Sequence, residues 1–224
     1  MLRKLFTALV TSGDPLDQAF SQLVEMLDHA QWMFIRANQV LAGNLPAEDV
    51  RDSLYRRDQS INELERSIRR KILRHLTINP GDDVAACLAL MSVAKDAERI
   101  GDYCKNVFEV GRFYKEGFHI AEFHDRLEQV RQRTRDLFPA VADAFRNSDA
   151  KKAHAAIEIA TAIGDECDEI IESLLKDDIA METHEAVAYS LLARHYKRVA
   201  SHLSNISTAV IGKLDDLDFK QEPQ

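Results

Sequence analysis

The sequence predicts an all-α protein built from two tandem bundles of three long helices, six helices in all. Only 8 glycines and 5 prolines occur among 224 residues, which is typical of long helices joined by few turns. Apolar residues recur at spacings of three and four through most of the chain, which is the period of a helix with one buried face. Six such patterns are present, and a break at Gly117 divides them into two groups of three.

Three helical patterns occupy the first half of the chain. The first covers about 16–42 and carries apolar residues at helical spacing up to a Gly-Asn turn. The second covers about 46–76; Pro46 suits the first turn of a helix, and Asn-Pro-Gly at 79–81 interrupts the pattern. The third covers about 82–116 and contains the most distinctive stretch of the sequence.

Three more patterns follow in the second half. They cover about 120–146, 150–176 and 183–211, and Asn-Ser-Asp at 147–149 is a turn and helix-capping signal between the first two. A bend is expected at Pro139, because proline cannot donate the helical hydrogen bond. The acidic end of the chain has no helical pattern and is expected to be loose.

An internal duplication relates the two halves. Three residues of the third helical pattern (Ala94, Arg99, Asn106) recur in the sixth as Ala193, Arg198 and Asn205, each shifted by 99 positions. Repeats of this kind predict one supersecondary unit used twice. We therefore predict a first three-helix repeat over 1–118 with a short lead-in, a second over 119–213, and an acidic tail over 214–224.

Composition excludes several functional classes. A formal charge of −8 and a pI near 5.5 disfavour nucleic acid, whose phosphates require a basic surface. The three cysteines have no metal-ligand spacing and fit buried, reduced thiols of a cytoplasmic protein. No apolar run is long enough to span a bilayer. The segment Leu-Arg-Lys-Leu-Phe at 2–6 does not form a secretory signal; it is either a packed terminus or a short amphipathic contact.

The third helical pattern carries a stripe of acidic side chains. Glu98 and Asp102 are like charges one helical turn apart, a pair that costs an isolated helix roughly 0.2–0.5 kcal/mol. Lys95 and Arg99 can offset that cost, and so can a bound cation. Gly101 costs about 1 kcal/mol more relative to alanine, so it predicts either close helix packing or the approach of a ligand or partner.

These residues resemble the PhoU family of phosphate-regulatory proteins. The resemblance rests on AKDAERIGDYCKNVFE at 94–109, and on Asp58 and Ile-Asn-Glu-Leu-Glu at 61–65 in the preceding helix; it extends over about 17–211. It implies two three-helix repeats, each with a Glu/Asp-x-x-x-Asp motif on its third helix. Glu98 and Asp102 match that motif in the first repeat. In the second repeat the matching residues are Lys197 and Ser201, so both acids are lost.

The resemblance also implies a metal, because some members of the family bind iron, zinc, magnesium or manganese at these motifs. Carboxylates one turn apart can bridge a hard divalent ion. Glu98 and Asp102, with Asp58 and Asn62 on the neighbouring helix, are therefore candidate metal ligands, in the first repeat only. The alternative is a solvated acidic face tied to lysine and arginine by pairs within the helix.

The implied function is regulatory rather than enzymatic. The resemblance implies a cytoplasmic homodimer that binds a phosphate transporter component, a phosphate-sensing histidine kinase, or both, represses uptake and starvation signalling, and meets the membrane only through these partners. We single out Arg99, Asn106, Arg198 and His202 as candidate partner-binding residues. The basic stripe of the sixth pattern, which contains Arg198 and His202, suits an acidic partner or an anion, and the alternative is a plain solvated face. Our hypothesis is that the Glu98/Asp102 face is the recognition surface, with or without a metal.

Three alternatives remain open at the level of sequence. The chain can serve a sodium–phosphate or low-affinity phosphate carrier instead, it can be a metal-storage protein or metal enzyme using Glu98 and Asp102, or it can be a purely structural helical dimer. No known catalytic motif supports the alternative of a metal enzyme. One Glu-x-x-His spacing occurs, at 116–119, but it coincides with the glycine break, and no phosphate-binding loop or nucleophile elbow is present.

Overall fold

The computed structural model describes residues 15–81, 83–176 and 180–212. Within those ranges the secondary structure is six helices without a strand, which confirms the all-α prediction. The bounds differ from the predicted ranges only by a few residues at the ends. The helices are α2 (Pro15–Leu41), α3 (Ala47–Ile78), α4 (Val84–Phe113), α5 (Ala121–Asn147), α6 (Ala150–Lys176) and α7 (Thr183–Ile211).

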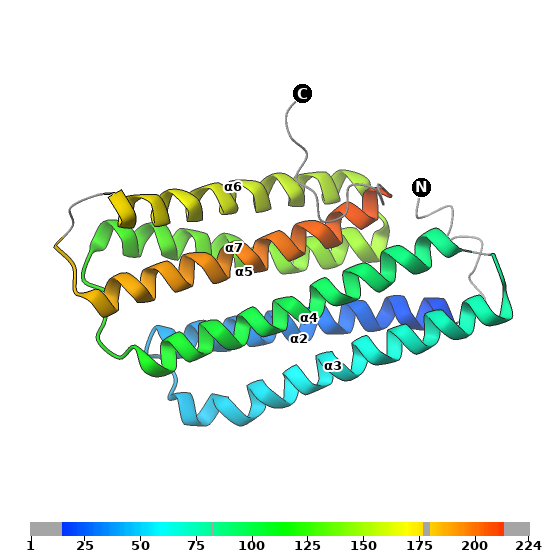
Figure 1. Cartoon of the computed structure of the whole chain (residues 1–224), viewed down its shortest axis with the longest axis horizontal. Coiled ribbons are helices and arrows are strands. Elements are labelled where there is room, and N and C mark those ends of the chain that lie inside the picture. The colour runs from blue at the N-terminus through cyan, green and yellow to red at the C-terminus, as the bar shows by residue number, and fades with distance from the viewer. Residues whose placement is uncertain (1–14, 82, 177–179, 213–224) are drawn as a thin grey trace.

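The helices form two adjacent three-helix bundles (Figure 1). In the first bundle α2, α3 and α4 pack on one another, and in the second α5, α6 and α7 do so. The bundles meet through α4 against α7 and, less extensively, through α2 against α5, while α3 and α6 lie at the outer sides. Helix α7 begins at the end of the molecule where α4 ends, so these two helices run antiparallel (Figure 1).

The proposed domain boundary at residue 118 lies in the connection between α4 and α5, and both boundaries stay a prediction. The Leu-Arg-Lys-Leu-Phe segment at 2–6 and the acidic tail at 214–224 lie outside the described residues. Pro139 lies inside α5, which continues to Asn147. None of the described helices is long and apolar enough to cross a membrane.

A buried cluster joins the two bundles. Phe34 of α2 packs against Phe138 of α5 and Tyr196 of α7, with ring centroids 5.6 Å apart in both pairs. The Tyr196 hydroxyl donates a hydrogen bond to Oδ1 of Asn38, whose Nδ2 donates to the Phe34 carbonyl at 2.8 Å. All four side chains are buried. The bundles therefore share one continuous core, in which a polar contact fixes their relative position.

Two glycines allow α4 to approach its neighbours closely. A Cβ on Gly111 would lie 2.7 Å from Cα and 2.8 Å from N of Leu41, so α4 and α2 are almost in backbone contact there. A Cβ on Gly101 would meet Cδ1 of Ile61 at 3.1 Å and Oδ1 of Asp58 at 3.8 Å. Of the two roles predicted for Gly101, the structure thus supports close packing against α3.

The cysteines are buried and form no disulfide. Burial raises the pKa of the Cys104 thiol and raises that of Cys167 to about 12. A thiol whose pKa is that high is almost wholly protonated near neutral pH and therefore a poor nucleophile. The geometry agrees with the predicted role of these residues as small apolar side chains in the core.

Candidate functional site

The acidic stripe lies on the part of α4 that faces α3, and basic side chains of α4 neutralise it. The Lys95 ammonium is 2.7 Å from Oε2 of Glu98, and the guanidinium of Arg99 lies 3.6 Å from Oδ2 of Asp102. These pairs are separated by three positions, so each occupies adjacent turns of one helix. They correspond to the alternative in which ion pairs within the helix offset the repulsion between Glu98 and Asp102.

A lysine that we did not single out from the sequence completes the stripe. The Lys105 ammonium lies 2.9 Å from Oδ1 of Asp102 and 2.9 Å from Oδ1 of Asp58, which is buried on α3. Burial alone would lower the pKa of Lys105, but its hydrogen bonds to Asp58 and Asp102 outweigh that effect and raise the pKa. The ammonium therefore stays charged and links α3 to α4.

These residues do not fit a divalent metal in the observed arrangement. Lys105 contacts both aspartates at the position where a bridging cation would have to lie, and two positive charges repel at that distance. The described residues contain no group of three or more His, Cys, Asp or Glu side chains that could hold a metal ion. Asn62 is half-buried one turn beyond Asp58. The metal role of Glu98, Asp102, Asp58 and Asn62 stays a prediction that direct metal analysis must test.

The second repeat has replaced this arrangement. Lys197 stands at the position that matches Glu98. Its ammonium lies 2.5 Å from Oδ2 of Asp168 and so pairs α7 with α6. Further residues of the first repeat can be matched to the second. The shift is 106 residues between α3 and α6, as from Ile61 to Cys167, and 99 residues between α4 and α7. Asp58, Asp102 and Lys105 correspond to Gly164, Ser201 and Ser204. The lysine is thus present only in the repeat that has both aspartates, as expected if it balances their charge.

The contact between α4 and α7, here called the seam, contains the predicted partner-binding residues. At one end of it the buried side chain of Asp96 accepts a hydrogen bond from Nδ2 of Asn205 at 2.9 Å. Its Oδ1 also lies 2.7 Å from Nδ1 of His202, and the His202 ring stacks on Tyr103 with centroids 5.7 Å apart. The polar edge of His202 that faces α4 is therefore already bound within the chain.

The other end of the seam repeats this cluster with one polar group unsatisfied. The shift of 99 residues relates Asp96 to His195, Tyr103 to His202, and Asn106 to Asn205. His195 lies against Tyr103, with ring centroids 6.0 Å apart. Its Nδ1 is buried and has no hydrogen-bond partner in the described part of the chain. Burial, reinforced by the charge of Arg194, lowers the pKa of His195, so its imidazole is neutral near pH 7.

Two arginines lie at the middle of the seam. Because Asp96 contacts His202 and Tyr103 contacts His195, the antiparallel register places Arg99 and Arg198 at about the same level along the two helices. The Arg99 side chain is 53% exposed and that of Arg198 is half-buried. Arg198 has no ion pair within the described residues. The duplication therefore places one arginine from each repeat near the middle of the seam, and of the two Arg99 is paired with Asp102.

Sequence reasoning missed Lys105 and Asp96. Lys105 lies three positions after Asp102, a spacing that predicts an ion pair in any helix. Asp96 lies on the apolar side of α4, where a charged residue requires a partner, and the shift of 99 residues relates it to His195. Their partners on α3 and α7 depend on how the helices pack against one another, and helical periodicity alone does not predict that packing.

Comparisons with known proteins agree with this architecture. A family model described as PhoU domain matches residues 23–110 and 127–210, one match in each bundle. A phosphate-specific transport system accessory protein PhoU homolog from Caulobacter vibrioides is 30% identical over 79 residues. That match covers 35% of this chain and 34% of the relative, so it spans about a third of the relative's length.

Two solved structures have the same fold. PhoU from Pseudomonas aeruginosa superimposes with a TM-score of 0.75 over 88% of this chain and 95% of its own, at 20% identity. The phosphate transport system regulatory protein PhoU from Streptococcus pneumoniae gives a TM-score of 0.73 over 92% of this chain and 98% of its own, also at 20% identity. The similarity to both extends across the two bundles and the seam between them.

Proposed function

Since the chain belongs to the PhoU family, we propose that it regulates cellular phosphate transport by binding other proteins and not by catalysis. Its partners in this proposal are a phosphate transporter component, a phosphate-sensing histidine kinase, or both. When phosphate is plentiful, association represses uptake and the starvation response. The match of the family model to both repeats supports this proposal, and so does the relative that is named as an accessory protein of a phosphate-specific transport system.

The single structural observation that carries the proposal is the seam of α4 and α7. Arg99 and Arg198 present two guanidinium groups at its middle, and a guanidinium forms two parallel hydrogen bonds to a carboxylate or phosphate. Because they come from different repeats, a partner must contact both bundles at once. A partner whose conformations differ in their affinity for this surface would be shifted toward the one that binds better, without covalent chemistry.

The Glu98/Asp102 face is a weaker candidate for recognition. Lys95, Arg99 and Lys105 neutralise it within the chain, and Glu98 is only 15% exposed. A partner that bound there would have to displace these pairs or accept a surface with little net charge. At the seam Arg198 has no ion pair within the described residues, so the seam is the surface we assign to partner binding.

The test is deletion of the gene followed by complementation. We expect phosphate uptake in phosphate-rich medium to rise on deletion and to return to normal with the wild-type gene. A double variant, Arg99→Glu with Arg198→Glu, should not restore it, because each guanidinium would become a carboxylate facing the partner. The matched control is Arg70→Glu with Arg133→Glu, two exposed arginines on α3 and α5; it should restore regulation fully. Unchanged uptake on deletion would refute the function.

Isolation of the protein from phosphate-rich cells identifies the partner. The proposal requires that a phosphate transporter subunit or a sensor kinase co-purifies with the wild type and is lost from the Arg99/Arg198 variant. Recovery of a sodium–phosphate or low-affinity carrier instead would favour that alternative. If the complex survived in this variant but was lost on charge reversal of Glu98 and Asp102, the acidic face would be the recognition surface and the seam would not.

A further inference from the structure

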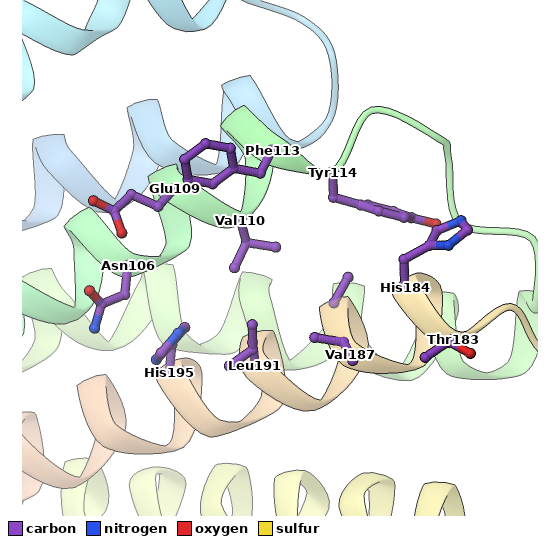
Figure 2. Close-up of a pocket in the computed structure, with 11 residues that line it drawn as sticks. Asn106, Glu109, Val110, Phe113, Tyr114, Thr183, His184, Val187, Leu191 and His195 are labelled. Carbon is purple, nitrogen blue, oxygen red and sulfur yellow. The ribbon is translucent and has the colours of Figure 1, made fainter.

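A groove continues the seam toward the end of α4. It lies between the last turns of α4 and the first turns of α7 and encloses about 690 Å³ (Figure 2). Its walls are apolar along most of its length, and its polar groups are concentrated at the two ends. The walls include Val110 and Phe113 from α4 and Val187 and Leu191 from α7, with Asn106 and His195 at the inner end.

Large apolar side chains are exposed around this groove. Phe113 is 73% exposed, Val187 51% and Leu191 42%. An isolated exposed apolar side chain is ordinary, but several around one concave site are typical of a surface that binds another protein. Release of the water that covers them would favour association with an apolar partner surface.

The acidic groups of the rim are already paired within the chain. Glu109 accepts a hydrogen bond from the Tyr55 hydroxyl at 3.2 Å. Glu116, beyond the end of α4, is bound to the imidazole of His184. Each carboxylate therefore already has one contact within the chain.

The basic groups of the rim are not paired. Arg112 lies over the ring of Phe113, 5.1 Å from its centroid, and it has no ion pair among the described residues. Arg194 is exposed next to His195 and also has no ion pair in the described ranges. These two guanidinium groups beside the groove can therefore pair with acidic groups of a partner, although the chain as a whole carries −8. Acidic residues on a partner segment would be complementary to these two arginines.

The inner end of the groove offers hydrogen bonds that the rest of the chain does not use. In the equivalent cluster at the other end of the seam, Asp96 is hydrogen-bonded to both His202 and Asn205. Here His195 leaves Nδ1 without a partner in the described part of the chain, and the half-buried Asn106 lines the same end of the groove. A polar side chain or backbone end of a ligand at this end of the groove would lie next to both side chains.

We propose that this groove binds an amphipathic helix of a partner protein, with apolar side chains in the groove and acidic residues against Arg112 and Arg194. The inference rests on the proposed function and names the chemistry of the partner segment. Residues 183–195 of α7 border the groove over about 18 Å, which corresponds to about three turns of a bound helix. Docking of an amphipathic helix into an apolar groove is a recurrent mode of recognition.

A second copy of this chain is a poorer occupant. In a symmetric dimer both copies use the same patch, so Arg112 and Arg194 of both copies would lie around one apolar contact. That arrangement gathers four arginines and adds no carboxylate beyond those that each copy already holds. An acidic helix adds carboxylates and uses the same apolar groups.

The test uses the full chain and two synthetic helical peptides of 16 residues. Both carry the same stripe of leucines; one has glutamates and the other lysines at the flanking positions. Fluorescence anisotropy should show that the glutamate peptide binds at least about tenfold more tightly than the lysine peptide, since roughly 1.4 kcal/mol separates affinities by that factor. Equal binding of the two peptides, or binding of neither, would overturn the proposal.

Variants place the binding in the groove. Val187→Glu with Leu191→Glu should abolish binding of the glutamate peptide, whereas Leu175→Glu, at an 81% exposed position on α6, should leave it unchanged. Arg112→Glu with Arg194→Glu should reverse the preference in favour of the lysine peptide. If the Val187/Leu191 variant instead converts a dimer to a monomer in sedimentation experiments, a second copy is the occupant and the proposal is wrong.

Complementation distinguishes this inference from the proposed function. A deletion strain that carries the Val187/Leu191 variant should lose phosphate regulation if the groove is the docking site. If that strain regulates uptake normally while the Arg99/Arg198 variant does not, the groove inference fails and the proposed function stands. If neither deletion nor any variant changes uptake, the proposed function fails, whatever the peptides do.

Discussion

The same substitution, glycine to alanine, should change the stability of this chain differently at three helical positions. Gly164 of α6 has no atom near its missing side chain, Gly101 faces the end of the Ile61 side chain, and Gly111 faces the backbone of Leu41. Alanine is favoured over glycine in a helix interior by about 1 kcal/mol at each position. The differences among the three must therefore come from the contacts of the added methyl group.

The structure gives the size of each effect. At Gly164 nothing lies within 4 Å, so alanine should stabilise the protein by about 1 kcal/mol. At Gly101 the methyl group would be 3.1 Å from Cδ1 of Ile61, which can turn aside, so the gain and the cost should roughly cancel. At Gly111 it would be 2.7 Å from Cα of Leu41, and α4 would have to move away from α2. Overpacking of this kind costs roughly 1–3 kcal/mol, which leaves a net loss of up to about 2 kcal/mol.

Thermal unfolding followed by circular dichroism measures these differences. For a protein of this size 1 kcal/mol corresponds to about 2–4 °C in Tm. We expect Gly164→Ala to raise Tm by about that amount, Gly101→Ala to leave it nearly unchanged, and Gly111→Ala to lower it by up to about 8 °C. If Gly111→Ala were as stable as Gly164→Ala, the close approach of α4 to α2 would be refuted.

Further predictions concern polar groups within and between the bundles. Tyr196→Phe should cost about 1–3 kcal/mol in chemical denaturation, because Oδ1 of the buried Asn38 loses its donor; an unchanged midpoint would argue against that contact. The pKa of His195 is lowered on folding, so its contribution to stability is present above its ordinary value of 6.5 and is lost as the pH falls below it. His195→Gln should therefore weaken the acid dependence of Tm, and identical pH profiles would contradict this. Elemental analysis of tag-free protein should find substoichiometric metal, and Lys105→Met should lower Tm by leaving its two aspartates unbalanced; a stoichiometric metal would show that Lys105 moves aside.

The helices could be predicted because each leaves a local signature. Apolar spacing fixed the buried face of every element, and turn residues such as Pro46 and Gly117 marked the ends. The duplication could be read from the recurrence of Arg99 and Asn106 at a constant shift. The same shift matches Glu98 of the first repeat to Lys197 of the second. The two repeats therefore differ in their charged groups, and each of these side chains has its own ion pair in the structure.

The site could be predicted only in part. The sequence placed Glu98, Arg99 and Asp102 on neighbouring positions of one helix, but it did not show which of them faces α3 and which faces α7. That depends on the rotation of α4 within the bundle, which Gly101 and Gly111 help to set through contacts with Ile61 and Leu41. For the same reason the groove beyond the seam left no local signal, since its two walls are about eighty residues apart in the chain.

The unequal ends of the seam have a consequence for stoichiometry. A duplicated protein with two identical halves would offer each partner two equivalent orientations, related by the approximate two-fold axis near Arg99 and Arg198. In this chain one end is closed by Asp96 with His202, and the other is open at His195. If a partner binds the seam as proposed, it should bind in one orientation only, and one copy of the chain should bind one partner. Loss of internal symmetry has given the surface a polarity that a perfect repeat lacks.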